Sequence, residues 1–581
     1  MNKEQERNRE TGEGLFSEGL SRRGFLVAAA GAGVLGAGAG ILAGCAPASS
    51  APETPAAGEG GGAGGNRAAA DWLGAPQEIA EGDVVRTVET EVLVVGAGTA
   101  GCFAACAAVE EGAQTVLIDK QPEIGNGVRD TLAALNSTQQ QETGDNPDAF
   151  TVINEMTRHS SGYGDERLYK VWADHSGEAI DWYTERLAEN GYEFKFETST
   201  LGTLNTPHYD VGHSLQWSDP ADPNVGSFTM TGGFLLDYGK RLGLEAHMGT
   251  TMLQLSQEGE RVTGLYAETE EGVVRYRASK GVIVCTGGYA ANTEMLEALQ
   301  PGTLDMASVH FAFPSCTGDG IKAMLWAGAA MDPVHAGMIF DRGAIPPDST
   351  DVADGNFFWM GSQPFLKVDL DGNRFTNESG PYDFILHTAN GIREKTYCTV
   401  WDSNYAADIL RFETHGCSRL YPYNNGALPV MPLDPVVAGM NAELAAAGVI
   451  VEAGTVEELA ERLNIPATAF AATVARYNEL ADTGADSDFG KEAHRLSHLD
   501  TAPFYGVRQR GGYFITTLDG VRIDTGMRVL DAAGKPIEGL YAAGDCSGGY
   551  YGISYVNLLA GDAAGRSVTF GRLAGKAAAQ L

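Results

Sequence analysis

Basic residues are scarce in this sequence. It contains 40 Lys and Arg residues against 76 Asp and Glu residues, which gives a formal net charge of −36 and a pI near 4.6. Nucleic-acid binding depends on Lys and Arg contacts to phosphates, so this balance argues against nucleic acid as a partner. It argues equally against docking on anionic lipid and favours an acidic, solvated surface.

Cysteine is also scarce, with eight residues at scattered positions, so the sequence does not suggest a disulfide framework. No C-x-x-C-H motif occurs, and the chain therefore carries no c-type haem of its own. Cys102 and Cys106 lie four residues apart on a predicted helix. Since one helix face gives poor disulfide geometry, we expect both to be small core residues.

Residues 1–45 have the features of an export signal. The twin-arginine motif SRRGFL precedes a Gly- and Ala-rich apolar stretch, which is weakly hydrophobic for a membrane span. The segment LAGC, ending at Cys45, resembles a lipoprotein cleavage box. The alternatives are a transmembrane helix and an ordinary cysteine near a plain cleavage site. We expect twin-arginine export and an extracytoplasmic protein that contacts the membrane only through a lipid on Cys45.

Residues 46–87 are interpreted as a flexible tether, because 46–70 consist mostly of Ala, Gly, Pro, Ser and Glu. Such a tether has an r.m.s. reach of roughly 25–30 Å. The folded part is expected to begin near Val88.

A β-α-β unit follows. Residues 91–95 and 115–118 are short apolar runs typical of buried strands, and residues 100–110 between them favour a helix. Further elements are predicted as strands at 281–285 and before a tight turn at 539–545, and as helices opening at the capping box of Thr455, at 467–481 and at 561–578.

The motif GAGTAG lies between the first predicted strand and helix. Gly96 permits a tight turn, Gly98 lets the backbone approach a pyrophosphate, and Gly101 lets helix and strand pack closely. Asp119 follows the second strand at the spacing expected for a ribose-binding acid. The alternative is a glycine-rich turn with an unrelated acid. The predicted cofactor contacts from this unit also include Thr99, Ala100 and Lys120.

Five later segments occur in a fixed order. They are KGVIVCTGGY at 280–289, TGDGI at 317–321, GNRFTNE at 372–378, KPIEGLYAAGD at 535–545 and FGR at 570–572. Together with the glycine motif, they resemble the fumarate reductase/succinate dehydrogenase flavoprotein family, which includes urocanate reductases and 3-ketosteroid dehydrogenases. The resemblance covers nearly everything from about residue 88 to the end.

This resemblance implies an α/β fold with FAD as the cofactor. A Rossmann-like FAD-binding domain would comprise residues 88–332 and 511–581, with an α+β capping domain inserted at 333–510. The active site would lie between the two domains, against the flavin. Further implied FAD contacts are Asn126, Gly127, Thr286, Gly287, Gly288, Gly544 and Asp545. Some members attach FAD to a histidine, but none lies between Asp119 and Thr151, so we expect non-covalent FAD.

The sequence departs from fumarate reductases at the substrate site. By eye, the proton-donating Arg of the family falls at Tyr382, one family His falls near Thr516, and the late His and Arg fall at Tyr551 and Tyr555. A dicarboxylate requires cations, whereas phenols and hydroxyls suit a neutral carbonyl compound. The alternative is that the three tyrosines are packing aromatics.

The expected reaction is hydride transfer between flavin N5 and an activated carbon–carbon bond. Tyr382 would protonate the α-carbon, and Tyr555 or Thr516 would polarise the carbonyl. Glu378 would relay protons; its alternative role is a structural ion pair with Arg374.

Electrons are expected from a separate membrane-associated donor, such as a cytochrome or a quinol-linked protein, because no second dinucleotide fingerprint is visible. No metal site is expected. Three other functions remain open: a ketosteroid-type dehydrogenase, a flavin electron carrier, or a carboxylate reductase that uses Arg393, Arg411 or Arg510.

Overall fold

The computed structural model describes residues 72–581 except 125–130, 199–208, 217–227, 311–312 and 413–432. Residues 1–71 lie outside these ranges, and with them the predicted signal, Cys45 and most of the predicted tether. Within the described residues, no helix is both long and apolar enough to span a membrane.

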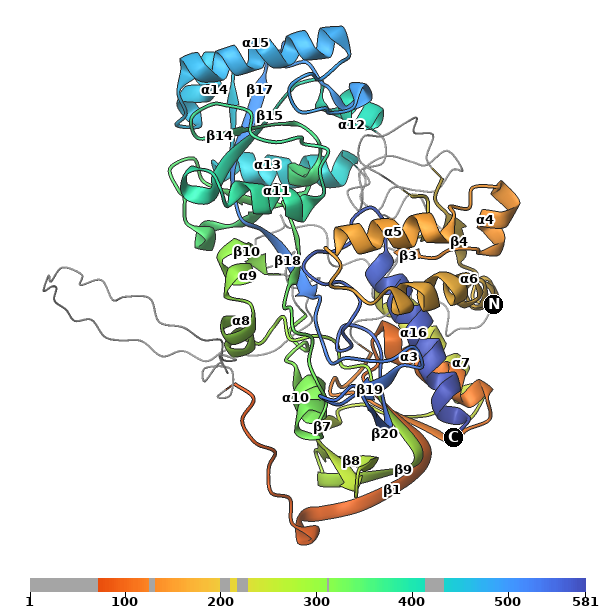
Figure 1. Cartoon of the computed structure of the whole chain (residues 1–581). Helices are drawn as coiled ribbons and strands as arrows, with labels where there is room; N and C mark the ends of the chain where they lie inside the picture. Colours follow the sequence, from red (N-terminus) through yellow and green to blue (C-terminus); the bar gives the residue numbers. More distant parts are fainter. Residues whose placement is uncertain (1–71, 125–130, 199–208, 217–227, 311–312, 413–432) are drawn as a thin grey trace, which may run out of the picture. The chain divides into compact units, whose positions relative to one another are not determined.

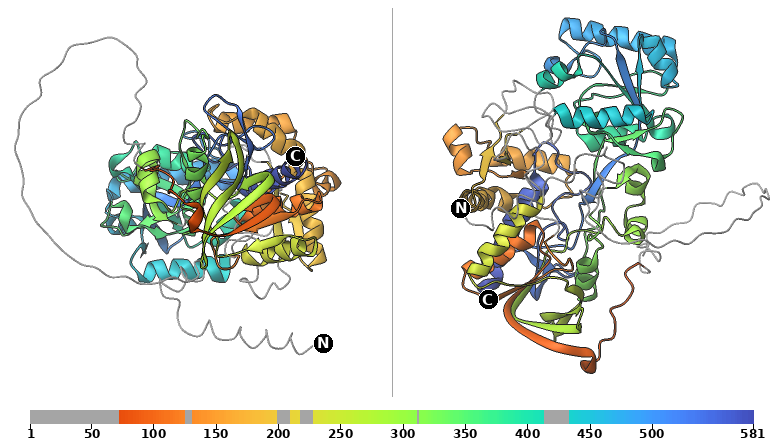
Figure 2. Two further views of the ribbon diagram at one scale, coloured as in Figure 1. Left: turned by 90° about the horizontal axis from the view of Figure 1, so that it is seen from below. Right: turned by 180° about the vertical axis from the view of Figure 1, so that it is seen from behind.

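An eight-stranded sheet forms the base of the described unit. Its main path runs β19-β20-β9-β1-β2-β6, and β7 and β8 extend it from β9. The strands are β1 (Val84–Val95), β2 (Thr115–Ile118), β6 (Glu245–His247), β7 (Thr251–Glu258), β8 (Arg261–Thr269), β9 (Gly272–Val284), β19 (Arg528–Leu530) and β20 (Pro536–Ala542). β1 and β9 run side by side along most of their length (Figure 2, left).

Two distant parts of the chain share this sheet. β9 pairs in parallel with β1 on one side and with β20 on the other. The predicted FAD-type domain in two sequence segments is therefore confirmed as an architecture (Figure 1). β1 begins at Val84, four residues before the expected start. The sequence did not reveal these residues because the first half of β1 mixes apolar, polar and charged residues, which gives only a weak hydrophobic signal.

Two helices close one face of the sheet around the glycine motif. They are α3 (Thr99–Glu110) and α16 (Asp562–Ala579). Residues 100–109 of α3 are all buried, since sheet and helices enclose it. A Cβ at Gly571 would lie 2.4 Å from Ala100 O, and one at Gly575 would lie 2.2 Å from Ala104 O. Small residues thus let the two helix backbones approach closely.

A mostly helical segment is inserted between β2 and β6, together with a three-stranded sheet of order β3-β5-β4. Its elements are β3 (Thr131–Ala133), α4 (Thr138–Thr143), α5 (Ala149–His159), α6 (Glu166–Glu189), β4 (Glu193–Phe196), β5 (Gly212–Gln216) and α7 (Phe228–Arg241). α5 ends at His159, whose side chain is hydrogen-bonded to the backbone of Tyr555 in the C-terminal segment.

The capping domain is built on a six-stranded sheet of order β13-β12-β17-β15-β14, with β16 paired to β17. Its strands are β12 (Gly343–Ile345), β13 (Asn356–Phe357), β14 (Leu366–Asp369), β15 (Thr396–Asp402), β16 (Ile450–Ala453) and β17 (Phe504–Arg510). Its helices are α11 (Tyr382–Ala389), α12 (Tyr405–Phe412), α13 (Ala438–Ala446), α14 (Val456–Arg462) and α15 (Ala467–Thr483).

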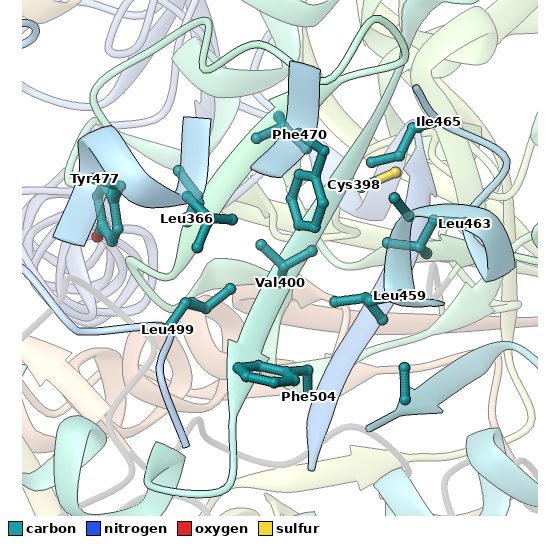
Figure 3. Packing of buried hydrophobic residues seen from close by; sticks show 14 of the residues in the cluster. Leu366, Cys398, Val400, Leu459, Leu463, Ile465, Phe470, Tyr477, Leu499 and Phe504 are labelled. Carbon is teal, nitrogen blue, oxygen red and sulfur yellow. The ribbon is translucent and has the colours of Figure 1, made fainter. Parts of the chain in front are cut away.

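Leu and Phe side chains of α14 and α15 fill the cap core. Leu459 and Phe470 pack over Val400 of β15 (Figure 3). Thr455 caps α14 through a hydrogen bond from Glu458 N, as the sequence predicted. The predicted helix at 467–481 is confirmed as α15.

A small sheet connects the cap to the lower sheet, in the order β10-β18-β11. Its strands are β10 (Ala307–His310), β11 (Gly337–Phe340) and β18 (Gly512–Thr517). The helices α8 (Thr293–Leu299) and α9 (Pro301–Met306) precede β10, and α10 (Asp319–Trp326) lies between β10 and β11. β11 leads into the cap and β18 leads out of it, and the two strands pair antiparallel. The six cysteines of the described residues are free thiols, and Cys102 and Cys106 are buried in α3.

The close packing of α3 and α16 predicts opposite effects for one substitution at two helical glycines. Gly575→Ala should destabilise the protein by roughly 1–3 kcal/mol, because the new methyl group meets backbone. Gly439→Ala in α13 serves as the control: nothing lies within 4 Å of its Cβ position, so a gain of up to about 1 kcal/mol is expected. Thermal unfolding of the FAD-loaded protein measures both. Equal effects at the two sites would contradict the packing argument.

Candidate active site

The predicted cofactor residues lie at one edge of the eight-stranded sheet. The motifs at 96–101, 286–288 and 544–545 follow the carboxyl ends of β1, β9 and β20, which are adjacent parallel strands. Ligands of open parallel sheets bind beyond these carboxyl ends. The structure therefore brings together residues that are far apart in the sequence.

The first turn has the geometry that the glycine spacing predicts. Gly96 has a φ of +101°, and a Cβ there would lie 2.4 Å from Cys285 O. A Cβ at Gly101 would lie 1.7 Å from Gly96 O. No side chain caps the N-terminus of α3 at Gly98, so the amides of its first turn, including those of Thr99 and Ala100, face the turn as an anion-binding end.

Asp119 and Lys120 follow β2 beside this turn. Asp119 accepts hydrogen bonds from Ala97 N at 2.6 Å and from Gln121 N at 2.8 Å. Lys120 Nζ forms an ion pair with Asp319 at 2.7 Å and donates to Thr317 Oγ1 at the same distance. These contacts place the TGDG segment next to the glycine turn.

The glycine motifs at 286–288 and 544–545 are packed as closely as the first. Gly287 and Gly544 have φ angles of +72° and +78°, and a Cβ at Gly288 would lie 2.0 Å from Thr517 Oγ1. Thr286 Oγ1 is buried, and Thr286 lies against the thiol of Cys546. Asp545 accepts a hydrogen bond from Thr516 Oγ1 at 2.9 Å.

These features fit FAD. The uncapped helix end suits a pyrophosphate, and the glycine turns admit a closely approaching ligand. Asn126 and Gly127, the remaining predicted contacts, lie outside the described residues.

A network of buried polar side chains holds the TGGY segment at 286–289 in place. Tyr289 Oη donates to Asp519 at 2.8 Å, and Gln300 Nε2 donates to the same carboxylate at 2.7 Å. His335 Nδ1 completes the group at 2.6 Å from Asp519. Burial opposes a charge on His335, but Asp519 outweighs burial, so the His335 pKa is raised. This network fixes the TGGY segment against the strand that leaves the cap.

The predicted tyrosines form a cluster around Phe340, at the end of β11. Tyr382 from the cap and Tyr555 from the C-terminal segment both lie against this ring, with centroids 5.0 and 6.3 Å away. Tyr551 lies 5.7 Å from Tyr555. All three tyrosines are buried. The structure thus brings the three tyrosines together, and nothing in the sequence pointed to Phe340 between the cap and the C-terminal segment.

Asp383 fixes the cap helix against the C-terminal segment. Its carboxylate accepts hydrogen bonds from Ser554 Oγ and from Asn557 Nδ2, the latter at 3.2 Å. These partners flank Tyr555, and Asp383 follows Tyr382 at the start of α11. The contact therefore holds the two tyrosines in one site.

His159 supports Tyr555 from the helical insert. Its Nε2–H donates to Tyr555 O at 2.6 Å, and its ring stacks on Phe384 at 4.8 Å. Burial lowers the His159 pKa, and nearby Asp383 opposes this effect. Three segments of the chain therefore meet at Tyr555.

The N-terminus of α16 lies beside Tyr551 and Tyr555. Ala563 N donates to Tyr555 Oη at 3.4 Å, which directs the positive end of the helix at that oxygen. Tyr551 Oη is buried and lies close to the carboxyl of Asp562, where it opposes the rise in pKa that burial causes. Burial raises the pKa of Tyr551 well above its ordinary value, so the phenol is neutral.

Asp562, in the first turn of α16, is a buried carboxyl group that the sequence did not single out. It accepts a hydrogen bond from Tyr550 Oη at 3.1 Å. Burial raises its pKa to about 7. Arg566, one turn later, lies over the rings of Tyr550 and Tyr551 and donates to Gly544 O.

Glu378 does not join the tyrosine cluster. It is buried in an ion pair with Arg374 at 2.7 Å and lies 3.4 Å from Lys491 Nζ. Burial would raise its pKa, but the two cations outweigh burial and lower it. The structural ion pair, which was the alternative to a proton relay, is confirmed.

The three arginines considered for carboxylate binding are engaged elsewhere. Arg393 pairs with Asp371, Arg411 with Asp408 and Arg510 with Asp305. Two other arginines lie against the cluster: Arg342, which follows β11 and is not marked by any motif, and Arg566, which lies over the ring of Tyr551. Among the described residues, no group of His, Cys, Asp or Glu has the arrangement of a metal site; His415 and Cys417 lie outside them.

Comparison with known proteins decides the family. The profile described as the FAD binding domain family matches residues 91–561. The chain belongs to this family. The flavoprotein's cofactor is therefore FAD, and it is an FAD-dependent oxidoreductase.

Two similar proteins are reductases. The vinyl phenol reductase of Lactiplantibacillus plantarum is 28% identical over 519 residues, covering 84% of this chain and 96% of the relative. The digoxin reductase of Eggerthella lenta is 27% identical over 601 residues, covering 95% and 97%.

Solved structures share the fold. An open flavocytochrome c3 fumarate reductase has a TM-score of 0.59 and 24% identity, covering 86% of this chain and 79% of that one. The 3-ketosteroid-Δ4-(5α)-dehydrogenase of Rhodococcus jostii has a TM-score of 0.63 and 22% identity, covering 85% and 97%. The predicted resemblance to fumarate reductases and ketosteroid dehydrogenases is confirmed.

The buried Asp562 predicts a pH-dependent loss of stability. Below pH 3.8, the ordinary pKa of an Asp carboxyl, Asp562 is protonated in both the folded and the unfolded state and does not lower the free energy of unfolding. As the pH rises to about 7, the unfolded state loses the proton first, so stability falls and then levels off. This cost is on the order of 4 kcal/mol at most. Asp562→Asn removes it.

Thermal midpoints of the FAD-loaded protein between pH 4 and 8 measure this effect. The midpoint of Asp562→Asn should rise relative to wild type over that interval. Asp237→Asn, the same change at an exposed helix position, should run parallel to wild type throughout. Parallel curves for Asp562→Asn as well would show that the carboxyl is not held neutral.

Proposed function

We propose that the protein is an ene-reductase for a neutral, enone-like substrate, supplied with electrons by a separate donor. The observation that carries this proposal is the tyrosine cluster: phenols from the cap and the C-terminal segment converge where fumarate reductases would need cations. The vinyl phenol and digoxin reductases are consistent with it, because both printed substrates are neutral compounds.

When bound, FAD supplies the hydride for reduction of a carbon–carbon double bond. The residues of this chain would then hold the substrate and manage the proton. The cap and the C-terminal segment exclude water, since Tyr382, Tyr551 and Tyr555 are 1%, 1% and 3% exposed.

Tyr382 is the proposed proton donor to the α-carbon. It stands at the N-terminus of α11 and is fixed opposite Tyr555 by the bonds of Asp383. Tyr555 is the proposed donor to the substrate carbonyl. The amide of Ala563 bonds its oxygen and favours the negative charge that grows there as the phenol polarises the substrate.

Thr516 and Glu378 are left out of this assignment. The Thr516 hydroxyl already donates to Asp545, and Glu378 is held between two cations in the cap. Tyr551 remains as a neutral phenol next to Tyr555, and we assign it to substrate contact rather than to proton transfer.

We also propose non-covalent FAD, export by the twin-arginine route and electron delivery by a membrane-associated redox protein. Each of these rests on the sequence: no histidine between Asp119 and Thr151, the SRRGFL and LAGC segments, and no second dinucleotide fingerprint.

A substrate panel tests the proposed function. The full chain with its flavin is assayed for oxidation of reduced viologen with neutral aryl and steroid enones, and with fumarate, urocanate and cinnamate-type acids. We expect turnover of neutral enones. Turnover of fumarate or urocanate alone would sink the neutral-substrate proposal.

Tyr382→Phe tests the proton donor. It should lower kcat roughly 10²- to 10⁴-fold, the range that general acid catalysis contributes, while FAD content is unchanged. Tyr397→Phe is the matched control: Tyr397 is another buried cap tyrosine, whose hydroxyl has no hydrogen bond to a described residue, and it packs on Phe375 instead. Full activity in Tyr382→Phe would remove the residue from the mechanism.

A further inference from the structure

Arg342 is a buried cation in the wall of the tyrosine cluster. It lies in the turn between β11 and β12 and is 2% exposed. Its guanidinium carbon is 4.0 Å from the ring centroid of Trp359, 5.0 Å from that of Phe340 and 5.9 Å from that of Tyr382. Phe340 is the ring on which Tyr382 and Tyr555 converge, so Arg342 belongs to the same constellation.

The position of this guanidinium is fixed from the cap side. Arg342 Nε donates to Ser362 Oγ at 3.0 Å, and Trp359 covers its face at cation–π distance. Arginine stays charged at all working pH values, unlike a buried lysine. Arg342 therefore places a permanent positive charge 5.9 Å from the centre of the Tyr382 ring, whereas Arg566 lies over the ring of Tyr551.

A buried phenol that gives up its proton faces an electrostatic cost. The phenolate left behind is a charge in a site with little water, and such a charge is strongly disfavoured unless a partner stabilises it. A cation within about 6 Å favours the charged form. Arg342 is placed to provide this favourable interaction.

We propose that Arg342 is a positioning residue that makes Tyr382 an effective proton donor, by stabilising the Tyr382 phenolate. This rests on the proposed function, because it requires Tyr382 to act as the acid. In the step, the Tyr382 O–H bond breaks and its electron pair stays on Oη. A C–H bond forms at the α-carbon, using the electron pair released as hydride adds to the β-carbon. Water then restores the phenol.

The other charged groups near Arg342 have partners of their own. The carboxyl of Asp341 is wholly buried; burial raises its pKa, and Lys367 and Arg342 oppose this effect. Lys367 lies 3.6 Å from Asp341 and competes for the same group. Asp383 is occupied by Ser554 and Asn557. Beyond Asp383 lies His159, and burial lowers its pKa.

The first test measures the ionisation of the Tyr382 phenol directly, in the absence of substrate turnover. The ultraviolet absorbance of tyrosinate is titrated with pH in the FAD-loaded protein, and the signal of Tyr382 is obtained by subtracting the titration of Tyr382→Phe. In Arg342→Met this signal should appear at higher pH than in the parent, and in Arg342→Lys it should lie between the two. Arg508→Met is the control, since Arg508 is a buried cap arginine bonded to Pro347 O.

The second test reads turnover. Arg342→Met should lower kcat roughly tenfold or more and enlarge the solvent isotope effect, with KM changed little, because the loss falls on proton donation. Arg342→Lys should recover part of kcat. Flavin content of each variant shows that it has folded.

The outcomes separate the two proposals. If Tyr382→Phe keeps full activity, the acid role in the proposed function fails, and the absorbance titration still reports whether Arg342 acts on Tyr382. If Tyr382→Phe is inactive while Arg342→Met retains the parental kcat and the parental titration, the proposed function stands and the role of Arg342 is overturned.

Discussion

The structure depends on β9 pairing in parallel with β1 on one side and β20 on the other. This pairing joins residues near the start of the folded chain to residues near its end. It also aligns the carboxyl ends of three strands, so the glycine turns at 96–101, 286–288 and 544–545 meet. Without the sheet, none of these segments is a cofactor site by itself. The close contact of α3 and α16, made by glycine and alanine, then closes the same edge.

The cap extends this arrangement to the substrate. β11 and β18 carry the chain into and out of the cap as neighbouring strands, so the cap is joined to the cofactor domain through paired backbone. Asp383 adds a side-chain link between α11 and the segment that carries Tyr555. The proton donor and the carbonyl donor that we propose thus come from different domains and share one aromatic centre, Phe340.

The sequence predicted the cofactor-binding half of the molecule well, because each structural element there has a recognisable pattern within a short stretch of residues. The apolar runs of β1 and β2, and the glycines between them, follow directly from what a phosphate-binding turn requires. The halves of β1 and β9 that alternate apolar and charged residues were missed, since a partly exposed strand has a weaker signal.

The substrate half was predictable only in part. The tyrosines were found because they replace family residues within recognisable segments. Phe340 and Arg342 were missed because their partners lie far away in the chain and neither sits in a motif. Asp562 was missed for another reason: an acid at the first turn of a helix is ordinary, and only its burial beneath Tyr550 makes it unusual.

The placement of Tyr382 and Tyr555 in two different domains bears on which molecules can accept electrons from the reduced flavin. Reduced flavins pass electrons to adventitious acceptors when nothing prevents it. The proton donor that we propose belongs to the cap, and Asp383 of the cap bonds the segment that carries Tyr555. In this proposal, the flavin's electrons reduce a substrate only where both domains contribute their tyrosines.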